Sequence, residues 1–182
     1  MHLIKDIKLQ KSIFFFLYFF VPALASAKLG FTAQSLMAMP FAIASFPLLR
    51  EDFRNKKLPN RILYPTTIST LILILGTAIF QGDFHLFTKS ITSAFFSFVG
   101  AFFLYLIARG GFGAGDVKLF LLTGLLLGTF ETPRVIPAAI FSIFGVALYS
   151  LFLLITKRAT AKTAVAFGPF IIIGTWISIF IS

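Results

Sequence analysis

The sequence predicts an all-α protein, a polytopic bundle of transmembrane helices. Of its 182 residues, 58% are hydrophobic and 12% are charged, and the mean hydropathy is +0.97. Soluble domains are about 45–50% apolar and about 25% charged. The charges fall in short segments between long apolar runs, and a membrane-spanning helix needs about 20 apolar residues. We therefore expect about seven spans in a single integral membrane domain, residues 1–182.

The runs are delimited by charged residues. They cover residues 12–27, 29–49, 62–82 and 90–108, a fifth run that follows a Gly-rich turn and ends at Glu131, and residues 135–156 and 163–182. The first run has a basic start and ends in an Ala-x-Ala pattern, so it also fits a secretory signal peptide, whose removal would leave six spans. We favour its retention as the first span, within the segment 1–28.

The fifth run is long enough to cross the bilayer only if it includes the Gly-rich turn that precedes it. Residues 119–130 would rise only about 18 Å at about 1.5 Å per residue. A start near Gly110 gives a full-length span. Asp116 would then lie at membrane depth, where a carboxylate has to face a cavity or a partner because exposure to lipid is costly.

Loops with many Lys and Arg residues alternate along the chain with loops that have few. The N-terminal tail and loops 50–61, 109–118 and 157–162 carry more Lys and Arg than the loops between them. Because basic loops stay in the cytoplasm, the N-terminus is expected there and the C-terminus outside. This arrangement puts Asp52 and Asp116 on the same, cytoplasmic, side.

The same composition excludes several kinds of partner. The chain has no Cys and two His, which excludes disulfides and Cys/His zinc sites. We expect no metal and no other cofactor. The net charge of +10 would suit nucleic acid, but its placement in short loops serves topology instead. We expect the protein to contact membrane lipid and to bind no nucleic acid.

Asp52 and Asp116 are the candidate catalytic residues, two of only six acidic residues in the chain. A carboxylate at the edge of a span is costly and is therefore a functional candidate. Two such groups packed together share a proton, so that one activates water while the other polarises a peptide carbonyl. Glycines before Asp116 allow close backbone approach. The alternative for Asp52 is a surface ion pair in a loop with five cations.

Three short motifs follow one another along the chain. They are Asp52 with Leu58-Pro59-Asn60, then Gly113-Ala114-Gly115-Asp116-Val117-Lys118, then Phe167-Gly168-Pro169-Phe170. In this order they resemble the motifs of the type IV prepilin peptidases: an Asp followed by Ile-Pro-Asn, Gly-x-Gly-Asp-x-Lys, and Phe-Gly-Pro-Phe/Leu. The resemblance covers residues 29–182, the family-like core, and Leu58 replaces the usual Ile.

The resemblance implies a membrane aspartyl endopeptidase in which Asp52 and Asp116 form the catalytic pair. Gly113 and Gly115 would shape the turn that brings Asp116 to the substrate, and we place the closest approach of the substrate beside Gly115. Lys118 follows Asp116 closely, and its role stays open between a part in the site and a positive-inside anchor.

Two further pieces of the motifs would shape the site. Pro59 and Asn60 would end the cytoplasmic loop and cap the third run. Gly168 and Pro169 would break or kink the seventh run near the site. The alternative is an ordinary membrane-helix kink without a part in the site. Glu51, next to Asp52, is expected to point elsewhere, in a loop ion pair.

The implied substrate is a prepilin-like preprotein with a basic leader and a following hydrophobic helix. It would be cut at the cytoplasmic face of the inner membrane of a prokaryote. Large bifunctional members of the family carry a Cys-x-x-Cys zinc insert and also methylate the product. This chain has no Cys, so the short forms that serve Flp/Tad-type pili or archaeal-type filaments are the closer comparison, and methylation is not expected. Either Glu51 or lateral docking of the apolar helix would attract the substrate.

Two other functions share single features with this sequence. A presenilin-like intramembrane protease shares Gly-x-Gly-Asp, but its Tyr-Asp pair and Pro-Ala-Leu motif do not occur at the required positions. A non-enzymatic transporter or scaffold is the second alternative. A transporter would show paired broken helices or internal symmetry, and the sequence shows neither.

Overall fold

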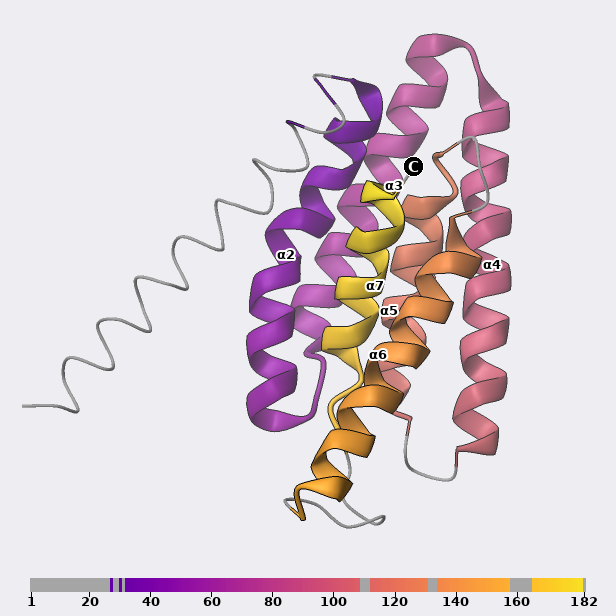
Figure 1. Cartoon of the computed structure of the whole chain (residues 1–182). Coiled ribbons are helices and arrows are strands. Elements are labelled where there is room, and N and C mark those ends of the chain that lie inside the picture. Colours follow the sequence, from indigo (N-terminus) through magenta and orange to yellow (C-terminus); the bar gives the residue numbers. More distant parts are fainter. Residues whose placement is uncertain are drawn as a thin grey trace, which may run out of the picture.

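The apolar runs form α-helices that stand side by side in the computed structural model of the chain (Figure 1). The structure describes residues 27, 30, 32–108, 112–130, 134–157 and 165–181. The helices in this part are α2 (Ala33–Asn55), α3 (Asn60–Gln81), α4 (Phe84–Ile107), α5 (Ala114–Leu127), α6 (Val135–Ile155) and α7 (Gly168–Phe180). Residues 12–26 of the predicted first span lie outside the described residues.

The all-α prediction is confirmed. Among the described helices, α3, α4 and α6 are long and apolar enough to cross a membrane, and α7 is a shorter apolar helix of 13 residues. Large apolar side chains on these long helices are exposed, as expected for surfaces that face lipid; Phe80 is 92% exposed and Ile155 is 72% exposed. The chain is an integral membrane protein, and a total of seven spans remains a prediction.

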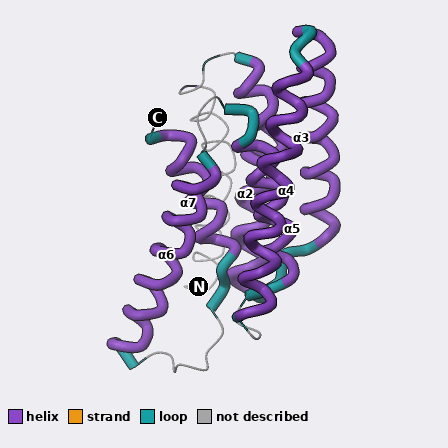
Figure 2. Tube along the Cα trace, turned by 90° about the vertical axis from the view of Figure 1, so that its right-hand side faces the viewer, coloured by secondary structure: helices purple, strands orange, loops and turns teal. Residues whose placement is uncertain are grey.

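Helix α5 is the centre of the bundle. It contacts each of the five other described helices, and Leu119, Leu122 and Leu126 are fully buried. A helix that is apolar on all sides is buried by its neighbours. At about 1.5 Å per residue, the 14 residues of α5 extend only about 21 Å. Around it, α2 packs against α3, and α6 lies beside α7 (Figure 2).

Small residues allow α4 and α5 to approach closely. The buried positions of α4 form a stripe of Ser and Ala: Ser90, Ala94, Ser97 and Ala101. Gly128 lies at the end of α5 against this stripe, and a Cβ atom added there would lie 2.6 Å from the Cα of Ser90. Small residues at helix interfaces in membranes permit such backbone contact. The α4–α5 contact therefore fixes the central helix.

Several helix ends differ from those predicted from charged residues. Helix α2 continues through Asn55, beyond the predicted end of the second run, and stops where Lys56 adopts the left-handed conformation with φ 50°. Helix α4 begins at Phe84, so the predicted loop 83–89 is wrong. Its start is set by Asp83, whose side chain accepts a hydrogen bond from the N–H of His85 at 2.9 Å.

The fifth and seventh runs also begin later than predicted. The predicted helix start near Gly110 is wrong, because α5 begins at Ala114 after its N-cap residue Gly113. The seventh helix is not kinked at Gly168 and Pro169 but begins there. Proline fits the first turn of a helix, where its missing N–H needs no helical partner, and it disrupts a helix interior. The motif around Asp116 and the motif around Gly168 and Pro169 therefore lie at the N-terminal ends of α5 and α7.

We expect Gly128→Val to reduce the stability of the bundle, because the new side chain would collide with the backbone of α4. Overpacking of this kind costs about 1–3 kcal/mol. The matched control is Gly100→Val on α4, where an added Cβ meets nothing within 4 Å. Thermal unfolding of the purified protein in detergent measures the difference. Equal stability of the two variants would show that the close approach of α4 and α5 is not required.

Candidate active site

Asp52 lies in the last turn of α2 and is held by the start of α7. Its side chain is 4% exposed, and its Oδ2 accepts a hydrogen bond from the N–H of Gly168 at 3.0 Å. Pro169 has no N–H, and the N–H of Phe170 bonds to the carbonyl of Phe167 at 3.0 Å. The Gly168 N–H is thus the donor in this first turn that reaches the carboxylate, and the positive end of the helix dipole favours the negative charge.

Asp116 has the corresponding arrangement at the start of α5. It is 7% exposed, and its Oδ2 accepts from the N–H of Gly113 at 2.9 Å. In return, the carbonyl of Gly113 accepts from the N–H of Asp116 at 3.0 Å. This reciprocal pair resembles a capping box, in which a side chain three residues into the helix satisfies the N-cap N–H. It fixes both the helix start and the carboxylate.

The two aspartates face one cavity of about 300 Å³. Its lining consists of Asp52, Lys56, Lys57, Leu58, Asn60, Gly113, Ala114, Gly115, Asp116 and Lys118. The carboxyl groups of Asp52 and Asp116 are close enough to interact electrostatically. They come together because the end of α2 and the starts of α5 and α7 lie toward the same, lower, end of the bundle in Figure 1.

Leu58 fills the space between the two glycines that adjoin the aspartates. A Cβ atom added to Gly115 would lie 3.0 Å from the Cβ of Leu58. One added to Gly168 would lie 3.2 Å from Cδ2 of Leu58 and 2.8 Å from Oδ2 of Asp52. Gly115 lines the cavity and also packs against Leu58, so the expectation that the substrate approaches beside Gly115 stays a prediction. The sequence motif included Leu58, but its packing between the two glycines was not predicted; an apolar residue within a polar loop was the signal for it.

Lys118 connects α5 to α3 at the rim of the cavity. Its Nζ donates to Oδ1 of Asn60 at 2.9 Å and lies 5.1 Å from the centroid of the Tyr64 ring. The predicted capping role of Asn60 is wrong in detail. Pro59 is the N-cap residue, without a side-chain bond, and Asn60 is the first residue of α3. Its side chain is directed to Lys118 instead of to the helix start.

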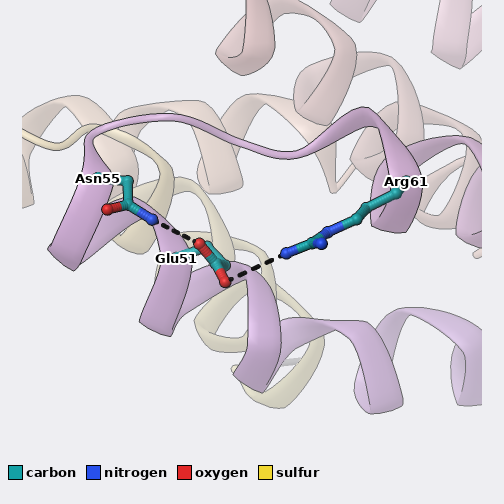
Figure 3. Close-up of polar contacts among 3 residues, drawn as sticks. All are labelled: Glu51, Asn55 and Arg61. Atoms are coloured by element: carbon teal, nitrogen blue, oxygen red, sulfur yellow. Dashed lines mark hydrogen bonds and ion pairs between the residues drawn. The ribbon is translucent and has the colours of Figure 1, made fainter.

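Glu51 makes the ion pair predicted for it, on a part of α2 next to the cavity (Figure 3). Its Oε2 accepts from Nδ2 of Asn55 at 2.7 Å, and its Oε1 lies 3.6 Å from a guanidinium nitrogen of Arg61. Arg61 is 77% exposed, so the pair contributes at most about 1 kcal/mol. The carboxylate of Glu51 is engaged with these two partners and is not part of the cavity wall around the aspartates.

No group of three or more His, Asp or Glu side chains that could hold a metal ion occurs in the described part of the chain. The polar groups of the cavity are two carboxylates, three lysines and one amide, together with backbone N–H groups. Paired carboxyl groups beside open space can activate water for attack on a carbonyl group. The chemistry available to this site is therefore acid–base chemistry.

Comparison with known proteins agrees with these motifs. The model of the type IV leader peptidase family matches residues 39–177, a range that includes both aspartates and all three motifs. Searches of curated proteins and of solved structures found no match. The resemblance seen in the sequence is confirmed by the family match. Since the match covers well over half of the chain, the protein belongs to the type IV leader peptidase family and is an aspartic-type prepilin peptidase.

Proposed function

We propose that Asp52 and Asp116 are the catalytic pair of this peptidase, and that it removes the basic leader of prepilin-like preproteins of the Flp/Tad type at the cytoplasmic face of the membrane. One observation carries the assignment of the pair. Both carboxyl groups are buried, both line one cavity, and each has a single oxygen held by a glycine N–H.

This arrangement supports hydrolysis by two carboxyl groups. The backbone bond engages Oδ2 of each aspartate and leaves Oδ1 for another partner. Close carboxyl groups share one proton. The ionised group takes a proton from water, whose oxygen attacks the peptide carbonyl, while the protonated group donates to the carbonyl oxygen. Collapse of the tetrahedral intermediate breaks the C–N bond, and a proton passes to the leaving nitrogen.

The charges around the cavity bear on how the substrate is recognised. Lys56, Lys57 and Lys118 line it and would repel a basic leader. Glu51, the other candidate for attracting such a leader, is bound to Asn55 and Arg61. Recognition through the apolar helix that follows the leader is therefore favoured over attraction by Glu51. The leader itself would leave the cavity toward the cytoplasm.

The proposal includes one peptidase domain over residues 1–182, with seven spans and a cytoplasmic N-terminus in the inner membrane of a prokaryote. The alternation of loop charge supports this orientation. Cleavage is proposed without methylation of the product, because the chain has no Cys for a zinc insert. The substrate class rests on the family and on the motifs of the short forms.

Asp52→Asn and Asp116→Asn should each reduce cleavage by about 10²–10⁴-fold, because an amide cannot take part in the shared-proton chemistry. Processing of a prepilin-like substrate by membranes that contain equal amounts of each variant measures the effect. The matched control is Asp83→Asn, since Asp83 caps α4 at the opposite end of the bundle. Near-normal cleavage by either of the first two variants would refute the catalytic pair.

Gly168→Ala should lower kcat by on the order of 10²-fold, since a displaced catalytic group has an effect of this size. The added methyl group would lie 2.8 Å from Oδ2 of Asp52 and would displace the carboxylate from its backbone donor. Gly100→Ala is the control, because its methyl group meets nothing within 4 Å. Steady-state kinetics at matched protein levels tests this, and an unchanged kcat would show that the Gly168 contact does not serve catalysis.

Single cysteines should reveal the sidedness of the site, because the chain has no native Cys to interfere. We expect a Cys at Asn55, at the end of α2, to react with a membrane-impermeant reagent from the cytoplasmic side. A Cys at Phe84, at the start of α4, should react from the outside. Both residues are exposed. The reverse pattern would refute the proposed orientation, and reaction of both from one side would refute the transmembrane path of α3.

A further inference from the structure

We propose that Leu58 is a positioning residue that sets the separation between the two catalytic aspartates, by filling the gap between Gly115 and Gly168. The proposal rests on the assignment of Asp52 and Asp116 as the catalytic pair. No substrate contact is assigned to Leu58. Its effect would pass through the backbone segments that carry the two carboxyl groups.

The loop that carries Leu58 is short and fixed at both ends. Lys56 ends α2 in the left-handed conformation, and its N–H donates to the carbonyl of Asp52 at 2.8 Å. Pro59 is the N-cap residue of α3, with φ −73°. Only Lys57 and Leu58 lie between these residues. The loop therefore has little freedom, and its first residue, Lys56, is hydrogen-bonded to the residue whose carboxylate lines the cavity.

Leu58 differs from the rest of this loop in its burial. Lys56 and Lys57 are exposed, whereas Leu58 is 9% exposed and belongs to the main hydrophobic core, together with Val117 and Phe167. An apolar side chain that turns inward from a loop removes its surface from water and ties the loop to the core. The side chain of Leu58 thus enters the protein at the level of the two aspartates.

The contacts of Leu58 are made with the residues that hold the carboxyl groups. Gly115 directly precedes Asp116, and its missing Cβ would meet the Cβ of Leu58 at 3.0 Å. The N–H of Gly168 holds Asp52, and the missing Cβ of Gly168 would meet Cδ2 of Leu58 at 3.2 Å. One side chain therefore separates the start of α5 from the start of α7. Protein interiors are close-packed, so its size limits how near these starts can approach.

The closest approach to each glycine uses a different atom of Leu58, which gives the proposal a selective test. Alanine keeps Cβ, the atom nearest to Gly115, although it removes Cγ and Cδ1, which a Cβ on Gly115 would meet at 3.6 Å; it removes entirely the branch that reaches Gly168. With this branch absent, the start of α7 can shift together with the N–H that holds Asp52. The alignment of the two carboxyl groups changes, although neither aspartate is altered. The expected loss is in the chemical step and not in substrate binding.

The test measures kcat and KM of the full chain in membranes with a prepilin-like substrate. We expect Leu58→Ala to lower kcat by on the order of 10–10²-fold with KM unchanged, because small displacements of catalytic groups have effects of this size. Leu58→Ile keeps a branched side chain of the same volume and should retain most of the activity. Leu125→Ala is the matched control, since Leu125 is 2% exposed in the separate core cluster with Met37 and Ile74. This control should lower thermal stability but leave kcat per folded molecule unchanged.

Two results would overturn the proposal. An unchanged kcat for Leu58→Ala at equal protein level would show that Leu58 only fills space, and a raised KM with normal kcat would make it a substrate contact. If Leu58→Ala does not accumulate in the membrane, Leu58→Val, which keeps Cβ and has a shorter branch, is measured by the same criteria. Activity of Asp52→Asn would refute the catalytic pair itself. Inactivity of Asp52→Asn together with normal kcat of Leu58→Ala would refute the role of Leu58 alone.

Discussion

The hydrogen bond from the N–H of Gly168 to Asp52 is the contact on which the site depends. It joins the end of α2 to the start of α7, two positions 116 residues apart in the chain. A buried carboxylate is costly unless it is hydrogen-bonded, so the two helix ends are held together by the need to satisfy this group. Helix α5 lies against both helices and brings Asp116 to the same cavity. The same hydrogen bond therefore stabilises the contact between α2 and α7 and fixes the position of the Asp52 carboxylate.

Much of the fold could be predicted because hydropathy reports the surroundings of a helix. Long apolar runs became α3, α4 and α6, and the order of the three motifs indicated both aspartates and the glycines beside them. The ends of the helices could not be read from charge. They are set by local caps, namely the side chain of Asp83 and the reciprocal bonds between Gly113 and Asp116. A cap acts through a few atoms, and a charge in the sequence does not show whether it lies inside a helix or beyond it.

The parts of the site that escaped prediction are contacts between distant segments. The sequence indicated that Gly115 allows close approach, and the structure shows that Leu58 packs against this glycine. It also placed Asn60 at a helix start, but its amide bonds to Lys118, 58 residues away. Neither partner follows from a local pattern, because the spacing of apolar residues describes one helix at a time. Such pairings depend on how helices cross.

The close packing of α4 against α5 also has a consequence for movement. Backbone contact at Gly128 leaves α5 little room to slide or rotate against α4, so Asp116 has a rigid support. A bound peptide needs more room than a cavity of about 300 Å³ offers to an extended chain with its side chains. The adjustment that admits it then falls to the walls of the cavity other than α5. Asp116 is thus expected to keep its place while a peptide enters.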